Sequence, residues 1–170
     1  MTRIKSPVDI TKLLSSSDSH ERELGYQSFL GRTHWLEGNT PNDLCRMACT
    51  QLQLNPGHVF VNPPKVYSTT ILWASQTRLE NEKLAMVEAA HRFIKDKGLE
   101  FPPIVVWNFY QSSRVKMVIH DGHHRAWFHN NLNHHINVVV LDPISHYAEV
   151  EARFHLAFQI RKLAIDLPIY

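Results

Sequence analysis

A nearly continuous apolar run, Ile136–Leu141 (INVVVL), places the tightest constraint on how this chain can fold. It lacks the alternation of a half-exposed strand and is typical of a central strand that is covered on both faces. A second run, Ile104–Trp107 (IVVW), follows two prolines and predicts another buried strand. Together with the helices predicted around them, these strands indicate a mixed α/β fold.

Other elements are predicted on both sides of these runs. Two further strands are expected from β-branched or alternating apolar residues, at Val66–Leu72 and Arg114–Ile119. Apolar residues at helical spacing predict three helices, over residues 42–54, 82–97 and 125–131. From residue 65 onward the predicted order is β-α-β-β-α-β-α.

A last helix is predicted near the end of the sequence. Asp142 and Pro143 are typical of an N-cap and a first helical residue, respectively. The apolar stripe of this helix is expected to include Tyr147, Val150 and Phe154, and to reach Arg161.

The length of 170 residues predicts one domain with an extension. Residues 1–64 contain one clear helix, one or two short ones and several breakers, too little for a core of their own. We therefore expect residues 1–64 to be a helical N-terminal elaboration that packs on residues 65–170. Trp35 and the face that carries Leu44 and Met47 are expected to be buried in that contact.

Composition excludes several functional classes. A formal net charge of +2 does not by itself indicate nucleic-acid binding. Two cysteines form no disulfide framework, which favours a reducing compartment. The first twenty residues lack the apolar segment of a secretory signal, and no apolar run approaches the roughly 18 residues that span a bilayer. A cytoplasmic protein without a membrane partner is expected.

The segment Asp121–Arg125 (DGHHR) follows a predicted strand and precedes a predicted helix. The N–H groups at the start of a helix attract anions, and Gly122 would let the backbone approach a phosphate closely. Arg125 offers a bidentate guanidinium, and His123 and His124 add donors or metal ligands. Asp121 could hold Mg²⁺ between phosphates. The pattern therefore predicts a phosphate-binding loop.

This segment resembles the loop of the ParB/sulfiredoxin superfamily, which reads GERR in ParB, GCHR in sulfiredoxin, and DGHHR or DGHTR in the free serine kinases. The flanking sequence agrees: Gln76-Thr77-Arg78 resembles the QxR box of ParB, and residues 98–104 resemble the strand entry of the family. The run 136–141 matches the strand that follows the phosphate helix. The resemblance covers about residues 66–142 and is closest to the serine kinases.

The resemblance implies a nucleotide-dependent phosphotransferase or NTPase that uses ADP or ATP, or else CTP, together with Mg²⁺. Its acceptor would be serine, another small hydroxyl compound or water. The family's general base falls on Glu80 by a gap-free count from Gly98, with Glu82 as the nearest competitor. Either acid could instead simply stabilise the start of a helix. Arg78 would join the phosphate-binding residues, and Asp121 and His123 the catalytic ones.

Two departures from the family leave other functions open. His123 stands where sulfiredoxin has its cysteine, so sulfiredoxin chemistry is not available at this position. His123 and His124 replace the Glu-Arg of GERR, and no helix-turn-helix is recognisable. A ParB-like DNA-binding protein or nuclease is the alternative, and a regulator that kept only the fold is a third hypothesis.

Six histidines lie between His120 and His135 and could form a zinc or iron site. The two adjacent pairs, 123–124 and 134–135, are expected at opposite ends of a short helix, which argues against this. Cys45 and Cys49 share one helix face and are interpreted as buried small residues rather than as a redox or metal pair.

Overall fold

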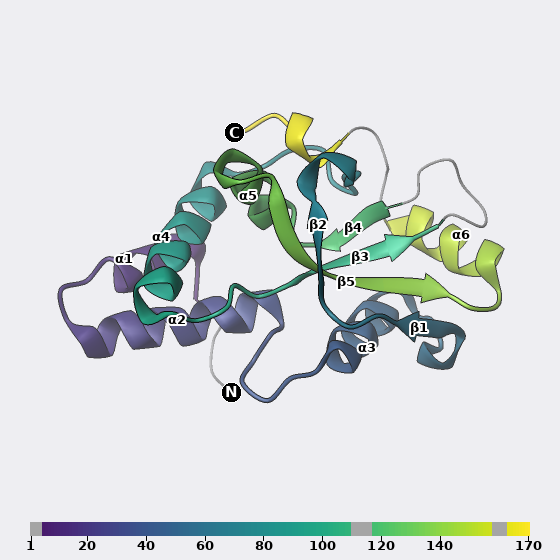
Figure 1. The fold of residues 1–170 in the computed structure, drawn as a ribbon, viewed down its shortest axis with the longest axis horizontal. Coiled ribbons are helices and arrows are strands. Elements are labelled where there is room, and N and C mark those ends of the chain that lie inside the picture. Colours follow the sequence, from purple (N-terminus) through teal and green to yellow (C-terminus); the bar gives the residue numbers. More distant parts are fainter. Residues whose placement is uncertain (1–4, 110–116, 158–162) are drawn as a thin grey trace.

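The computed structural model describes residues 5–109, 117–157 and 163–170. In this part of the chain the fold is mixed α/β, with six α-helices and a five-stranded mixed sheet (Figure 1). The helices are α1 (Pro7–Leu14), α2 (Ser19–Thr33), α3 (Pro41–Leu52), α4 (Asn81–Lys97), α5 (His123–Leu132) and α6 (Tyr147–Ala157). The strands are β1 (Val59–Val61), β2 (Lys65–Ser68), β3 (Ile104–Asn108), β4 (Met117–Asp121) and β5 (His135–Pro143).

The strand β5 is the centre of the sheet. It pairs in parallel with β3, with Val139 opposite Val105, and antiparallel with both β1 and β2. The strand β4 pairs antiparallel with β3 and forms the far edge. The two apolar runs therefore occupy neighbouring central strands, and the prediction that they are buried strands is confirmed.

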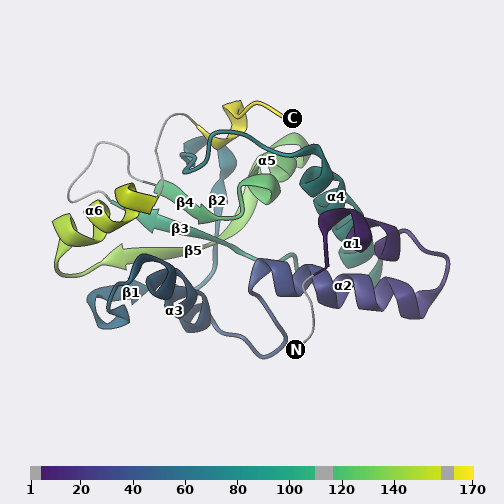
Figure 2. The same ribbon diagram turned by 180° about the vertical axis from the view of Figure 1, so that it is seen from behind.

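Alternate residues of these strands pack on opposite sides of the sheet, as the pleat requires. On one side Trp107 and Leu141 share a core cluster with Leu44 of α3 and Phe154 of α6. On the other side a second cluster includes Ala126 of α5. Figures 1 and 2 show the sheet between these groups of helices.

The helices α1 and α2 pack with α4 beside the end of the sheet where β4 leads into α5 (Figures 1 and 2). Their shared core includes Ile10, Phe29, Val87 and Phe93. The N-terminal third thus contributes to two cores, through α1 and α2 here and through α3 on the sheet. Trp35 and Met47 pack partly buried against the α3 cluster, as the sequence predicts.

From residue 65 onward the order of helices and strands agrees with the prediction, but two local predictions are wrong. The strand β2 ends at Ser68, and a 3-10 turn takes the place of the rest of the expected strand. Ser68 caps this turn, because its Oγ accepts a hydrogen bond from the N–H of Thr70.

The last helix begins at Tyr147 rather than at Pro143. Pro143 is the final residue of β5 and pairs with Val59 of β1. The strand β1 has three residues, which is too short to show any periodicity in the sequence. Asp142 accepts a hydrogen bond from the side-chain amide of Asn62 instead of capping a helix. Arg161 and residues 114–116 of the predicted strand lie outside the described residues.

None of the described helices combines the length and the apolar composition needed to cross a bilayer.

Candidate functional site

The DGHHR segment lies where β4 ends and α5 begins. Gly122 is the N-cap of α5 and has a φ of 116°, which a residue with a side chain rarely adopts. A Cβ at this position would also collide with the side chain of Ile104. Glycine thus lets the helix start directly against β3, and the predicted strand–glycine–helix arrangement is confirmed.

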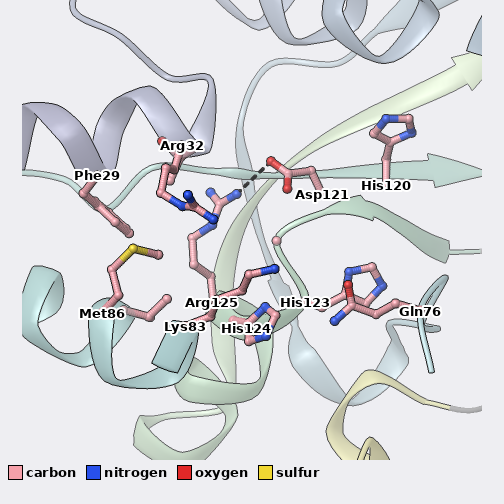
Figure 3. Close-up of a pocket in the computed structure, with 13 residues that line it drawn as sticks. Phe29, Arg32, Gln76, Lys83, Met86, His120, Asp121, His123, His124 and Arg125 are labelled. Carbon is pink, nitrogen blue, oxygen red and sulfur yellow. Dashed lines mark hydrogen bonds and ion pairs between the residues drawn. The ribbon is translucent and has the colours of Figure 1, made fainter. Parts of the chain in front are cut away.

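A cavity of about 170 Å³ opens beside the start of α5 (Figure 3). We call residues 120–125 its floor, and the lining residues of α2 and α4 its walls. The wall residues are Phe29, Arg32 and Thr33 of α2, and Lys83, Met86 and Val87 of α4. Among the described lining residues three cations, Arg32, Lys83 and Arg125, accompany one carboxylate, that of Asp121.

The two histidines of the motif are held as neutral acceptors. The N–H of Ser75 donates to Nε2 of His123 at 2.8 Å, and the N–H of Glu80 donates to Nε2 of His124 at 3.0 Å. A ring nitrogen that accepts a hydrogen bond carries no proton. Burial lowers the pKa of His123 to about 3 and that of His124 to about 4. Their side chains therefore hold residues 75–80 against the floor.

His120 is also neutral, through a different pair of contacts. The indole N–H of Trp107 donates to its Nδ1 at 3.0 Å, so the ring proton is on Nε2, which lies 2.7 Å from Oε1 of Gln51. Burial lowers the pKa of His120 to about 4. This hydrogen-bonded chain links the floor to β3 and α3.

Arg125 is buried, and its known contacts are structural. Its Nη1 donates to the carbonyl oxygens of Pro102 and Pro103, at 3.2 and 2.9 Å. Its Nη2 lies 3.1 Å from Oδ2 of Asp121. Burial lowers the pKa of the guanidinium and the Asp121 carboxylate raises it, so the side chain stays charged. Two of its five donors thus join α5 to the residues that lead into β3, and a third joins it to the end of β4.

The other predicted site residues lie around the cavity rather than in it. Glu80 is the N-cap of α4, and its half-exposed carboxylate lies 3.6 Å from Nζ of Lys83, a wall residue. Arg78 is exposed and stacks over the ring of Tyr170, and the structure does not bring it to the cavity. Gln76 does line the cavity, and its amide donates to the carbonyl of Arg78.

The described residues contain no group of three or more His, Cys, Asp or Glu side chains that could hold a metal ion by themselves. Asp121 lines the cavity, but one of its oxygens already contacts Arg125. Mg²⁺ is commonly held by one or two carboxylates together with phosphate oxygens of a substrate. The site therefore fits Mg²⁺ only when a bound ligand supplies further oxygens.

Sequence reasoning misses three residues that build this site. Arg32 is about ninety positions from the motif, and no local pattern connects the two. Ser75 contacts His123 only because residues 73–75 run alongside β4, where Trp73 pairs with Val118. Lys83 could have been found, because it stands three residues after Glu80 in the first turn of a predicted helix.

No protein-family model, curated protein or solved structure matches this chain. The resemblance to the ParB/sulfiredoxin superfamily stays a prediction from residues 66–142. Function is therefore inferred from the cavity and the residues around it.

Proposed function

We propose that this protein is a nucleotide-dependent phosphotransferase or NTPase whose cavity holds the phosphate groups of the nucleotide. The observation that carries the proposal is the charge of the cavity. Three cationic side chains and the start of α5 surround it, against one carboxylate among the described lining residues. Helix N-termini and guanidinium or ammonium groups are the usual partners of phosphate.

The size of the cavity suits phosphate groups rather than a whole nucleotide. Pockets that enclose drug-sized ligands measure about 300–1,000 Å³, and this one is about 170 Å³. The nucleoside of ADP, ATP or CTP would extend outside it. Lys83 would contact the phosphates from α4, and the backbone N–H groups of His123 and His124 would contact them from the floor.

Mg²⁺ is expected to accompany the nucleotide, held by Asp121 and by phosphate oxygens. When bound, it would neutralise charge on the phosphates. The sequence resemblance and the position of Asp121 on the cavity floor support this assignment.

Glu80 is the proposed general base. Its carboxylate contacts Lys83 at the edge of the cavity, and its own N–H is bonded to His124 on the floor. The hydroxyl oxygen of a small acceptor such as serine would form a bond to the terminal phosphorus of the nucleotide. The bond from that phosphorus to its bridging oxygen would break, and the nucleotide would leave with one phosphate fewer. Glu80 would take the hydroxyl proton. With water as the acceptor, the same step is nucleotide hydrolysis.

The test compares Glu80→Gln with Glu82→Gln. Glu82 is exposed in the same helical turn, two residues further on, so it is a matched control. Glu80→Gln should keep nucleotide affinity and lower turnover by about 10²–10⁴-fold, the usual share of a general base. Glu82→Gln should have little effect. Turnover would be measured with ATP, ADP and CTP, Mg²⁺, and serine or water as the acceptor.

Two outcomes would overturn parts of the proposal. Full activity in Glu80→Gln would remove Glu80 as the base. Failure of the wild-type protein to bind any of the nucleotides would remove the phosphotransferase function itself.

A further inference from the structure

Arg32 reaches the cavity from a part of the chain that the motif does not include. It lies in the last turn of α2, and α2 belongs to the N-terminal elaboration. Figure 3 shows its side chain extending from α2 toward the floor, near Arg125 and across from Lys83. The wall of α2 is held in place by Phe29, which is fully buried in the core that α2 shares with α1 and α4.

Within the part of the chain that the structure describes, the side chain of Arg32 makes one hydrogen bond. Its Nη1 donates to the carbonyl oxygen of Lys5 at 3.1 Å. No carboxylate of the described residues forms an ion pair with it. Arg125 differs, because it is paired with Asp121 and buried. Arg32 is therefore the arginine of this cavity whose charge no carboxylate matches in residues 5–109, 117–157 and 163–170.

The balance of charge in the cavity defines the ligand. The negative charge of Asp121 offsets the positive charge of Arg125. The histidines of the floor are neutral and accept hydrogen bonds. Two cations remain, Arg32 on one wall and Lys83 on the other. The half-exposed Glu80 near Lys83 offsets little of this charge, because exposed ion pairs are weak.

We propose that Arg32 is a ligand-binding residue that clamps a doubly charged phosphoryl group against the floor, opposite Lys83. The inference rests on the proposed function, since it assumes that phosphate occupies this cavity. It assigns a role to the N-terminal elaboration: α2 supplies one wall of the binding site.

The experiment measures binding of inorganic pyrophosphate by isothermal titration calorimetry to the full chain. Arg32→Gln removes the charge and should weaken binding about tenfold or more, as expected for a lost charged hydrogen bond. Arg32→Lys should recover part of this loss. Arg22→Gln is the matched control: Arg22 is also on α2 and donates to a backbone carbonyl, that of Ser16, but it does not line this cavity. It should change affinity less than twofold.

A second measurement needs only the wild-type protein. Pyrophosphate should slow hydrogen exchange of the amides at the end of α2, around Arg32, as well as those at the start of α5. Protection at α5 without protection at α2 would contradict the clamp.

The experiment distinguishes failure of the role proposed for Arg32 from failure of the phosphate-binding function. If the wild-type protein binds pyrophosphate and Arg32→Gln binds it equally well, Arg32 is not a ligand contact and the proposed function stands. If the wild-type protein binds no pyrophosphate, both the phosphate site and the clamp are wrong.

Discussion

The floor and the walls of the cavity use their polar groups in different ways. On the floor, His123 and Arg125 are about 5% and 4% exposed, and their side chains bond to Ser75, to Asp121 and to two proline carbonyls. On the walls, Arg32 and Lys83 are partly exposed and extend toward the cavity. The side chains of the recognisable motif hold the site together, and much of the charge available to a ligand comes from the walls.

The largest effect that would test this contrast is a loss of stability at acidic pH, caused by the buried histidines of the floor. The pKa values of His120 and His123 are lowered to about 4 and about 3, against about 6.5 in an unfolded chain. Below pH 6.5 the unfolded chain binds protons that the native floor does not, so stability is fully present above that pH and is lost as the pH falls.

Between pH 6.5 and pH 4.5 the free energy of unfolding should fall by about 2 kcal/mol for each of these histidines, or about 4 kcal/mol for the two together. Urea denaturation at the two pH values measures the loss. The pKa values of His124 and His129 are also lowered to about 4 and add to the loss, so His120→Gln should reduce the total by about 2 kcal/mol, the share of one histidine. A stability that stays constant down to pH 4.5 would show that the floor tolerates charged histidines.

The next effect is the removal of Arg125. Arg125→Ala leaves the carbonyls of Pro102 and Pro103 and the one-third-exposed carboxylate of Asp121 without their partner, which should cost about 2–4 kcal/mol of stability. Arg92→Ala is the control, because Arg92 forms an exposed pair with Glu88 that should contribute at most about 1 kcal/mol. Thermal and urea unfolding distinguish the two variants.

The sequence alone predicts a direct role for Arg125 in phosphate binding, with a loss of about 1.5–3 kcal/mol of binding free energy in Arg125→Ala. A variant that keeps its stability but loses pyrophosphate affinity would favour that direct role. A variant that loses stability would favour the structural role seen here.

Much of the fold can be predicted because its signals are local. The apolar runs of β3 and β5 and the glycine after α4 mark their elements without reference to the rest of the chain. Pro143 misleads for the same reason: its local pattern is that of a helix start, whereas its pairing with Val59 depends on a contact more than eighty residues away.

The site is less predictable because contacts distant in sequence decide it. The five residues of the DGHHR segment identify the floor. They do not reveal that the guanidinium of Arg125 donates hydrogen bonds to the carbonyl oxygens of Pro102 and Pro103. Nor do they indicate Arg32, which depends on how α2 packs against α4. Arg78 illustrates the opposite error, since the match of residues 76–78 to a three-residue pattern does not bring its side chain to the cavity.

The smallest effect concerns how ligand binding depends on pH. The charged and titratable groups that line the cavity are the cations Arg32, Lys83 and Arg125, the carboxylate of Asp121, and the histidines His120, His123 and His124. The pKa values of the histidines are lowered to about 4, 3 and 4, so above pH 5.5 they are neutral. A phosphate monoester has a second pKa of about 6, so its dianionic fraction rises about fourfold between pH 5.5 and pH 7.5.

If the walls select the dianion, the affinity for O-phosphoserine should rise about fourfold over the same range, because only the ligand changes charge. Isothermal titration at constant ionic strength measures this, with circular dichroism at pH 5.5 to verify that the protein is folded. Histidines that bound phosphate as cations would give the opposite slope, since they would lose their charge as the pH rises. An affinity that falls toward pH 7.5 would therefore place the binding charge on the floor and reverse the contrast between floor and walls.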